Sequence, residues 1–285
     1  MKYLAGKIDG EPAVFAVLGD EAVNLTAENQ ELGTDLMAMI GDYTQVTRLM
    51  GKLHNAPKVA VSAITPTLPI AAPETILCLG LNYAEHVAEG GYEIPDYPAL
   101  FMRGRRSLMA AGQPMVVPAA SEQLDYEAEL MIVIGKPGRH IAEADALDHV
   151  FGYTTFNDGS VRAYQKKTHQ WTPGKNFDST GAVGPVVVTP DELPEGAKGL
   201  RIESRIGDEV LQSSNTDNMM WSVPRIIATI SEFKTLMPGD LIATGTPPGV
   251  GQAKPGGPRW LKPGEMIEVE IEGIGVCANP VVAES

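Results

Sequence analysis

The sequence predicts an α+β protein in which a small N-terminal α/β unit precedes a larger, β-rich domain. Two observations lead to this fold class. Apolar runs of strand length recur from residue 74 onward, and Gly and Pro punctuate them densely. Helix-like spacing of apolar side chains is clear in residues 35–53, but long helical patterns are few after that segment. This combination favours packed sheets or a rolled barrel over a parallel sheet that alternates with helices.

The N-terminal unit is expected to span residues 1–70. Residues 2–25 resemble strands joined by Gly-containing turns, and residues 35–53 have the apolar period of a helix. The proline-rich stretch 65–73 lacks the backbone donors and the φ freedom that regular structure needs. We therefore place the boundary in this stretch and assign residues 71–285 to the larger domain.

The larger domain contains a series of strand candidates with short connections. Each combines apolar and β-branched side chains and is bounded by turn-forming residues. The candidates are residues 75–79, 124–134, 183–188, 201–206, 241–244 and 265–272.

Composition restricts the classes of function. The chain has 285 residues, of which 44% are apolar, and this is enough to build a core. Its formal net charge of -14 repels nucleic acid and anionic membranes, so we expect neither as a partner. Cys78 and Cys277 lie in apolar runs, which fits buried thiols in a reducing compartment. No export signal or membrane span is visible, and we expect a cytoplasmic protein.

Acidic residues alternate along the strand candidate 124–134. Asp125, Glu127 and Glu129 are two residues apart, so in a strand they share one face at spacings of about 7 Å. Such a cluster is either a solvated face of an acidic protein or a site that a cation compensates. Asp158 follows an aromatic run, where a buried strand gives way to a loop. Carboxylates without a nearby Cys or His pair favour Mg²⁺, Mn²⁺ or Ca²⁺ over zinc.

Five segments in a fixed order resemble the fumarylacetoacetate hydrolase family. They cover roughly residues 74 to 281, and the joint pattern is far more specific than any one segment. The segments are Gly80-Leu81-Asn82-Tyr83-Ala84-Glu85-His86-Val87-Ala88-Glu89, Asp125-Tyr126-Glu127-Ala128-Glu129, Asn157-Asp158, Gly174-Lys175-Asn176-Phe177-Asp178 and Thr244-Gly245-Thr246-Pro247-Pro248-Gly249-Val250-Gly251.

The resemblance implies a mixed β-roll fold and a bound metal ion. Family members hold the ion with a Glu-x-Glu pair and a later Asp, which correspond here to Glu127, Glu129 and Asp158. Members cleave C–C bonds in acylpyruvates, decarboxylate oxaloacetate, or isomerise and hydrate related dienoates. The resemblance also implies a homodimer, which would cover open sheet edges. The family pattern assigns only three metal ligands. We therefore expect Asp125 to contact groups around those ligands and not to bind the ion itself.

The His86–Glu89 pair and Lys175 are expected to carry out the chemistry beside the metal. His86 and Glu89 are three residues apart, so on a helix the carboxylate can orient the imidazole. Alone, this spacing is common on exposed helices, but hydrolytic members of the family look to use such a dyad to activate water. Lys175 follows a turn signal, and in the family such a lysine lies at the site, where a cation stabilises a developing enolate.

Further residues are expected to bind the substrate. Arg162 and Gln165 follow Asp158 by four and seven residues, so in a helix all three project from one side. Arg162 could grip a carboxylate and Gln165 could donate to a keto oxygen, or both could lie on an exposed helix with an ion pair to Asp158. The resemblance suggests that the Thr246 hydroxyl and the backbone N–H groups of its Gly-rich loop receive a carboxylate.

One segment departs from the family pattern. Residues 100–107 carry Arg103, Arg105 and Arg106, where family members often have a proline-containing segment. We predict that Arg106 attracts a second carboxylate of the substrate. The alternatives are a solvated loop or pairing with acids of a partner subunit.

Together these features predict a metal-dependent hydrolase that acts on a small 2-oxo acid. With Mg²⁺ or Mn²⁺, and possible use of Ca²⁺, it would cleave the C–C bond of an acylpyruvate-type 2,4-dioxo acid through a metal-stabilised pyruvate enolate. Oxaloacetate decarboxylation and 2-oxo-dienoate isomerisation use the same enolate without water. A metal- or carboxylate-binding protein without catalysis is the alternative from another class.

Overall fold

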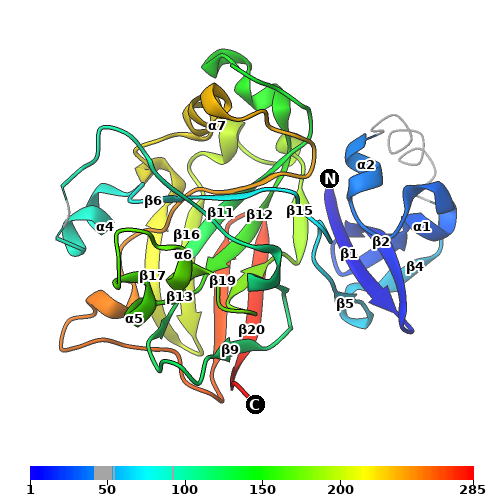
Figure 1. The fold of residues 1–285 in the computed structure, drawn as a ribbon. Coiled ribbons are helices and arrows are strands. Elements are labelled where there is room, and N and C mark those ends of the chain that lie inside the picture. The colour runs from blue at the N-terminus through cyan, green and yellow to red at the C-terminus, as the bar shows by residue number, and fades with distance from the viewer. Residues whose placement is uncertain (42–52, 54, 92) are drawn as a thin grey trace.

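Two packed sheets build the centre of the protein, in a computed structural model that describes residues 1–41, 53, 55–91 and 93–285 (Figure 1). In the larger sheet, the strand order is β4-β3-β2-β1-β15-β12-β11-β18-β6-β7. In the smaller sheet it is β17-β16-β19-β20-β9. Strands β11 and β12 pack against β16 and β19, and apolar side chains of both sheets form one core between them.

The strands are short, and most are antiparallel to their neighbours. Their bounds are β1 Lys2–Ile8, β2 Glu11–Leu18, β3 Glu21–Asn24, β4 Lys58–Ala60, β5 Thr65–Pro66, β6 Ile76–Gly80, β7 Ala99–Met102, β8 Leu108–Ala110, β9 Met115–Val117, β10 Leu124–Asp125, β11 Ala128–Ile134, β12 Val150–Asp158, β13 Ser160–Val161, β14 Gly181–Val183, β15 Val186–Val188, β16 Arg201–Ile206, β17 Glu209–Asn215, β18 Leu241–Ala243, β19 Met266–Ile271 and β20 Gly275–Ala283.

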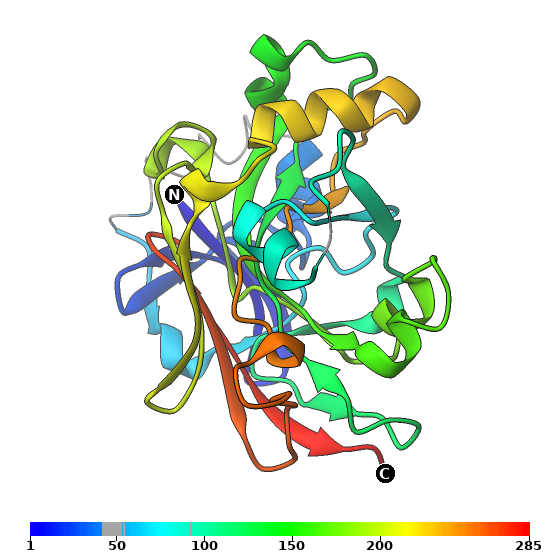
Figure 2. The ribbon, with the colours of Figure 1, turned by 90° about the vertical axis from the view of Figure 1, so that its left-hand side faces the viewer.

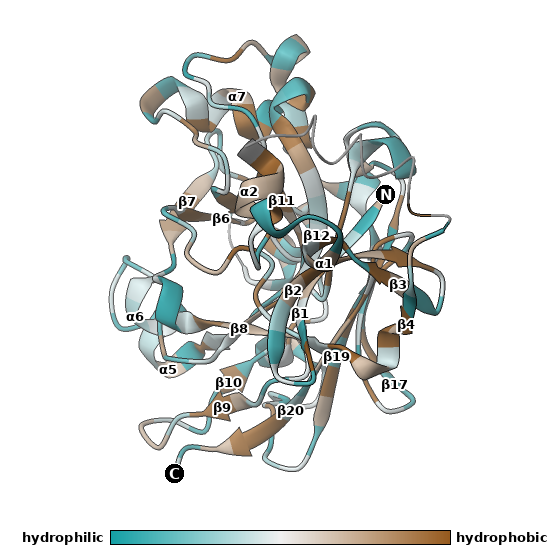
Figure 3. Cartoon of the chain, turned by 90° about the vertical axis from the view of Figure 1, so that its right-hand side faces the viewer, coloured by the Kyte–Doolittle hydropathy of each residue, from teal (hydrophilic) through white to brown (hydrophobic). Residues whose placement is uncertain are grey.

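Within the described residues, the helices are few and, apart from α7, no longer than about two turns. They are α1 Leu25–Glu28, α2 Met37–Gly41, α4 Ala84–Glu89, α5 Arg162–Gln165, α6 Thr172–Lys175 and α7 Val223–Phe233, with 3₁₀ turns η1 Gln30–Leu32, η2 Val61–Ala63, η3 Arg105–Ser107, η4 Glu143–His149, η5 Pro190–Glu192, η6 Glu195–Ala197, η7 Thr216–Asn218 and η8 Gly251–Ala253. Figure 3 shows the apolar colour along many of the strands.

Helix α7 covers one end of the large sheet. Its buried face, which includes Ile226, Ile227 and Ile230, packs into the core, and its outer turns lie beside η4 (Figure 2). Sequence analysis did not predict this helix. The helix expected over residues 35–53 is present as α2, and the remainder of that expectation falls on residues 42–52, which lie outside the described residues.

The N-terminal unit shares its sheet with the larger domain. Strand β1 pairs antiparallel with β2 on one side and with β15 on the other, where Lys2 lies opposite Val188. Strand β5, within the proline-rich stretch, also pairs with β1. The boundary predicted near residue 70 falls in the connection between β5 and β6, which are strands of the same sheet.

Candidate metal centre and active site

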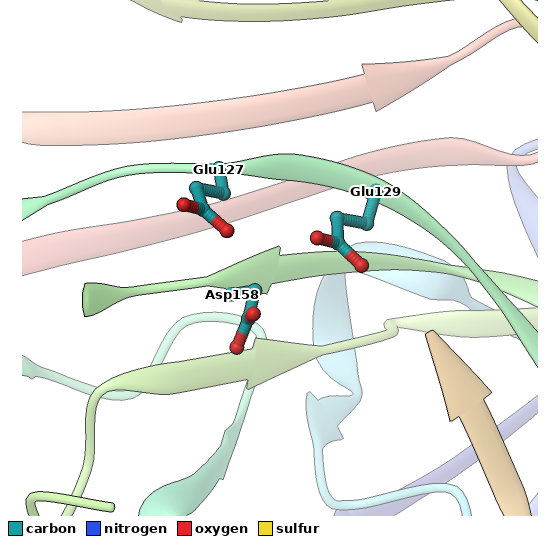
Figure 4. A group of neighbouring side chains, drawn as sticks. All are labelled: Glu127, Glu129 and Asp158. Atoms are coloured by element: carbon teal, nitrogen blue, oxygen red, sulfur yellow. The ribbon is translucent and has the colours of Figure 1, made fainter. Parts of the chain in front are cut away.

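Glu127, Glu129 and Asp158 converge at one buried point (Figure 4). Glu129 lies on β11, Glu127 lies immediately before that strand, and Asp158 ends the neighbouring strand β12. The backbone N–H of Asp158 donates to the Glu127 carbonyl at 2.9 Å, which fixes the two strand ends side by side. One carboxylate oxygen from each residue lies within 4.8 Å of the others. The structure thus brings together the three acids expected to hold a metal.

Three buried cations face this cluster. Arg103 forms an ion pair with Asp158, and Arg162 Nη2 lies 2.6 Å from Glu127 Oε1. The Lys175 ammonium lies 2.7 Å from Glu127 Oε2 and 2.6 Å from Asp158 Oδ2. Glu127 and Asp158 are therefore compensated by the chain itself.

The charges are unevenly compensated. Burial would raise the pKa of Glu127, but Lys175 and Arg162 outweigh burial and lower that pKa to about 2. Burial together with the charges of Asp158 and Glu127 raises the pKa of Glu129 well above its ordinary value. Burial would lower the pKa of Lys175, but Asp158 and Glu127 raise it, so the ammonium remains charged. Glu129 is thus the acid that the chain leaves without sufficient positive charge.

These residues fit a hard divalent cation. Within the described part of the chain, Glu129 has no Lys or Arg partner, and its Oε2 only accepts the Gly245 N–H at 2.9 Å. An ion held by one oxygen of each acid would supply the missing charge, and three carboxylate oxygens suit Mg²⁺, Mn²⁺ or Ca²⁺. The Lys175 ammonium forms ion pairs with two of these acids, so those two acids would contact both Lys175 and the ion.

The Gly-rich loop after β18 binds carboxylates of the protein itself. Its backbone N–H groups donate to Glu129 from Gly245, to Glu89 from Gly249 at 2.6 Å, and to Asp125 from Gly251 at 2.7 Å. We expected these groups to receive a substrate carboxylate, and that expectation was wrong for the three N–H groups named here. The loop instead fastens three acidic side chains around the site.

Thr246 is also engaged within the protein. Its hydroxyl donates to the Ala128 carbonyl at 3.0 Å and accepts from Gln212 Nε2 at 2.8 Å. Thr246 borders the site cavity, but its hydrogen is not free for a substrate. Gln212, on β17, was not predicted from the sequence, and nothing in its local pattern signals that role.

His86 and Glu89 lie on helix α4, whose residues 86 and 87 are buried. His86 Nδ1 is 3.6 Å from Glu89 Oε1, longer than a hydrogen bond but close enough for a charge interaction. Partial burial would raise the pKa of Glu89, but His86 and the N–H groups of Gly249 and Val250 outweigh it and lower that pKa. An ionised Glu89 therefore faces the imidazole, and His86 borders the same cavity as the acids.

Arg162 and Gln165 lie on the short helix α5 beside the cluster. Arg162 Nε donates to Asp125 Oδ2 at 2.8 Å, and its Nη1 donates to Gln165 Oε1 at 2.7 Å. Arg162 therefore forms ion pairs with Asp125 and Glu127. The alternative interpretation of the sequence had named Asp158 as its partner. Asp125 supports the cluster through Arg162 and does not join the three converging acids.

The arginines of residues 103–106 do not act as one group. Arg103 is buried against Asp158, and its other contacts include Ser107 and Thr180. The side chain of Arg106 is 89% exposed, and it lies 3.9 Å from Asp178 at the surface. The structure does not bring Arg106 into the lining of the site, because η3 turns it outward.

The site opens into a small cavity of about 30 Å³. Its polar lining includes Glu127, Glu129, His86, Arg162, Gln165 and Lys175, and its apolar lining includes Phe101 and Trp171. Trp171 packs so closely on Gly80 that a Cβ there would lie 2.2 Å from the indole ring. Sequence analysis missed Phe101, Trp171 and Gln252 as lining residues, although Gln252 directly follows the Gly-rich loop.

A known protein family and several solved structures match this chain. The sequence model described as "Fumarylacetoacetate (FAA) hydrolase C-terminal" matches residues 75–282. This chain belongs to the fumarylacetoacetate hydrolase family. The match confirms the predicted family and covers every residue of the acidic cluster.

Relatives of this family member include enzymes with different named activities. It is 42% identical over 224 residues to oxaloacetate tautomerase fahd2, mitochondrial, of Xenopus laevis, covering 78% of this chain and 69% of that protein. Among solved structures, fumarylacetoacetate hydrolase from Exiguobacterium antarcticum matches with a TM-score of 0.85 at 33% identity over 100% of both chains. Maleylpyruvate hydrolase from Sphingobium sp. SYK-6, in complex with manganese(II) and pyruvate, matches with a TM-score of 0.84 at 27% identity, again over 100% of both. These structures confirm the predicted mixed α and β fold.

Among the residues that the structure describes, no helix has the length and apolar character required to cross a membrane.

Proposed function

We propose that this protein is a divalent-metal-dependent enzyme that converts a small 2-oxo acid through its enolate. The observation that carries the proposal is the buried convergence of Glu127, Glu129 and Asp158 beside a cavity lined by His86 and Lys175. Mg²⁺ or Mn²⁺ suits the oxygen ligands best, and Ca²⁺ is compatible with them. Bound there, the cation would act as a Lewis acid that polarises a keto oxygen.

The reaction best supported is keto–enol tautomerisation of an oxaloacetate-like 2-oxo dicarboxylic acid. A proton leaves C3, a base holds it, and the former keto oxygen takes up a proton, so no atom is lost. His86 is the base that borders the cavity, and the ionised Glu89 beside it stabilises the imidazolium. Lys175 places a positive charge near the developing enolate. The Xenopus laevis relative is named an oxaloacetate tautomerase.

Hydrolysis of an acylpyruvate-type 2,4-dioxo acid is the second candidate. The His86–Glu89 pair favours it, because a base assisted by a carboxylate can also remove a proton from water. The water oxygen would bond to the distal carbonyl carbon, the C–C bond would break, and its electron pair would form pyruvate enolate, which then takes a proton at C3. The neighbour solved with manganese(II) and pyruvate is named a hydrolase. Decarboxylation of oxaloacetate would use the same enolate.

The test supplies oxaloacetate and an acylpyruvate in parallel, each with Mg²⁺ or Mn²⁺. We expect rapid loss of enol absorbance with oxaloacetate and little pyruvate. Glu127→Gln should lower this rate by about 10³-fold, since charge stabilisation by a metal contributes several kcal/mol. The exposed Glu122 provides the matched control, Glu122→Gln, which should retain full activity.

Four outcomes would change the proposal. Faster cleavage of the acylpyruvate would select the hydrolase, and rapid release of CO₂ from oxaloacetate would select the decarboxylase. Full activity of Glu127→Gln would contradict the metal assignment. If no 2-oxo acid were turned over while metal and ligand still bound, the protein would be a binding module.

The proposal includes a cytoplasmic homodimer. Strands β4 and β7 end the larger sheet, and β17 and β9 end the smaller one, so this chain leaves several strand edges for a second copy to cover. A monomeric mass in light scattering at micromolar concentration would contradict the dimer.

A further inference from the structure

Gln252 is presented to the site cavity by a firmly held stretch of backbone. It lies in η8 and borders the same cavity as Glu127 and Glu129. Its own N–H donates to Asp125 Oδ2 at 3.0 Å, and the preceding N–H of Gly251 donates to Asp125 Oδ1 at 2.7 Å. Asp125 is fully buried and paired with Arg162. The backbone at Gln252 is thereby held by a buried ion pair.

The side-chain amide of Gln252 has an oxygen that accepts no hydrogen bond. Its Oε1 is buried and has no hydrogen bond to any residue that the structure describes. Two other polar side chains of the cavity are engaged, since Gln165 accepts from Arg162 and Thr246 donates to the Ala128 carbonyl. A buried acceptor left alone costs about 1–3 kcal/mol, so a ligand or a water is expected at this atom.

The position of Gln252 indicates which part of a substrate it meets. The Gly-rich loop begins at Gly245, which binds the metal-site acid Glu129, and continues to Gly249, which binds Glu89 of the dyad. Gln252 follows three residues later, beyond the dyad anchor. A 2-oxo acid bound at the acidic cluster would share one cavity with Gln252, so a group that extends from the cluster into this cavity can meet the Gln252 amide.

We propose that the Gln252 amide recognises an oxygen-bearing group at the distal end of the substrate, which selects 2-oxo acids that carry a second carboxylate or keto group. The inference rests on the proposed function and narrows its substrate class. The two ends of an amide are nearly equivalent in shape, so one orientation accepts a hydrogen bond from an enol hydroxyl and the other donates to a carboxylate.

Calorimetric binding to the Mn²⁺-loaded protein tests this assignment without turnover. The probes are oxalate, which has no distal group, and 3,3-difluorooxaloacetate, which keeps the distal carboxylate but has no proton at C3. We expect Gln252→Ala to weaken binding of difluorooxaloacetate by about 10-fold or more, as for a hydrogen bond to a charged group. Oxalate binding should change less than about 2-fold. Gln252→Glu should weaken difluorooxaloacetate further through charge repulsion, and the exposed, remote Gln30→Ala serves as control.

The outcomes separate this assignment from the function on which it rests. If wild type binds both probes and Gln252→Ala weakens both equally or neither, the distal role of Gln252 is overturned. If oxalate does not bind to metal-loaded wild type, the proposed function fails and this assignment fails with it. Thermal unfolding of each variant shows whether the fold is retained, and Gln252→Glu provides the second variant if the alanine protein is unstable.

Discussion

Lys175 places one positive charge against two of the three acids. Its ammonium contacts both Glu127 and Asp158, and its side chain is almost fully buried. In the metal-free chain it reduces the repulsion between these two buried carboxylates, together with Arg103 and Arg162. At the residue scale, Lys175 therefore links the stability of the site to its chemistry.

We predict that Lys175→Met destabilises the metal-free protein by about 3–5 kcal/mol, the range for removing one partner of a buried ion pair. Saturating Mn²⁺ should stabilise this variant more than wild type, because the ion restores the lost charge. Urea denaturation with and without Mn²⁺ measures both effects, and the exposed Lys166→Met provides the control. A loss below about 1 kcal/mol, or equal stabilisation by Mn²⁺ in both proteins, would contradict this account of Lys175.

Sequence analysis identified the acids but not their partners. Alternation along a strand was enough to associate Glu127 with Glu129, and the end of a buried strand indicated Asp158. The sequence did not indicate that Arg103 contacts Asp158 or that the Gln252 N–H contacts Asp125, because both contacts join segments far apart in the chain. The arginine-rich segment did not indicate which of its side chains is buried: Arg106 faces solvent, whereas Arg103 lies inside against Asp158.

At the scale of elements, Asn82 connects three segments, two of which border the site. Its Nδ2 donates to the carbonyls of Trp221, just before α7, and Thr244, at the start of the Gly-rich loop. Its Oδ1 accepts from the Trp221 N–H at 2.6 Å. Asn82 itself lies two residues before helix α4, which carries His86. The side chain thus holds the dyad helix and the Gly-rich loop in one arrangement.

We predict that Asn82→Ala lowers the free energy of unfolding by about 2–4 kcal/mol, because it leaves buried backbone groups without partners. Urea denaturation measures this loss. Asn218→Ala, at an exposed position with a single side-chain contact, should change stability by less than about 0.5 kcal/mol. Equal effects of the two substitutions would show that Asn82 does not hold these segments together.

The strand predictions succeeded where the apolar runs were uninterrupted. Strands β6, β16, β18 and β19 begin and end within a residue or two of their predicted limits. The predicted strand 183–188 is divided into β14 and β15 at Gly184-Pro185, because proline has no N–H to extend the ladder. Helix α7 was missed, since its apolar face lies among strand-like runs and Pro224 stands near its start.

At the scale of the whole molecule, the fold brings acidic residues from distant parts of the chain together at one point. Adjacent antiparallel strands β11 and β12 supply the ligands, and the Gly-rich loop after β18 supports them from a third strand. The family resemblance predicted this β-roll, which composition alone left open between sheets and a barrel. The continuity of β1 with β15 could not be predicted, because strand pairing between segments far apart leaves no local pattern.

The central claim is that Glu127, Glu129 and Asp158 hold one divalent cation. It is tested most directly by titrating Mn²⁺ into the protein and following the electron paramagnetic resonance signal of the free ion. We predict one Mn²⁺ per chain for wild type, and affinity lowered at least 10²-fold or so in Glu129→Gln and Asp158→Asn, since each removes a charged ligand. The exposed Asp178→Asn should bind as wild type does. Binding unchanged in both ligand variants, or absent from wild type at millimolar Mn²⁺, would contradict the account.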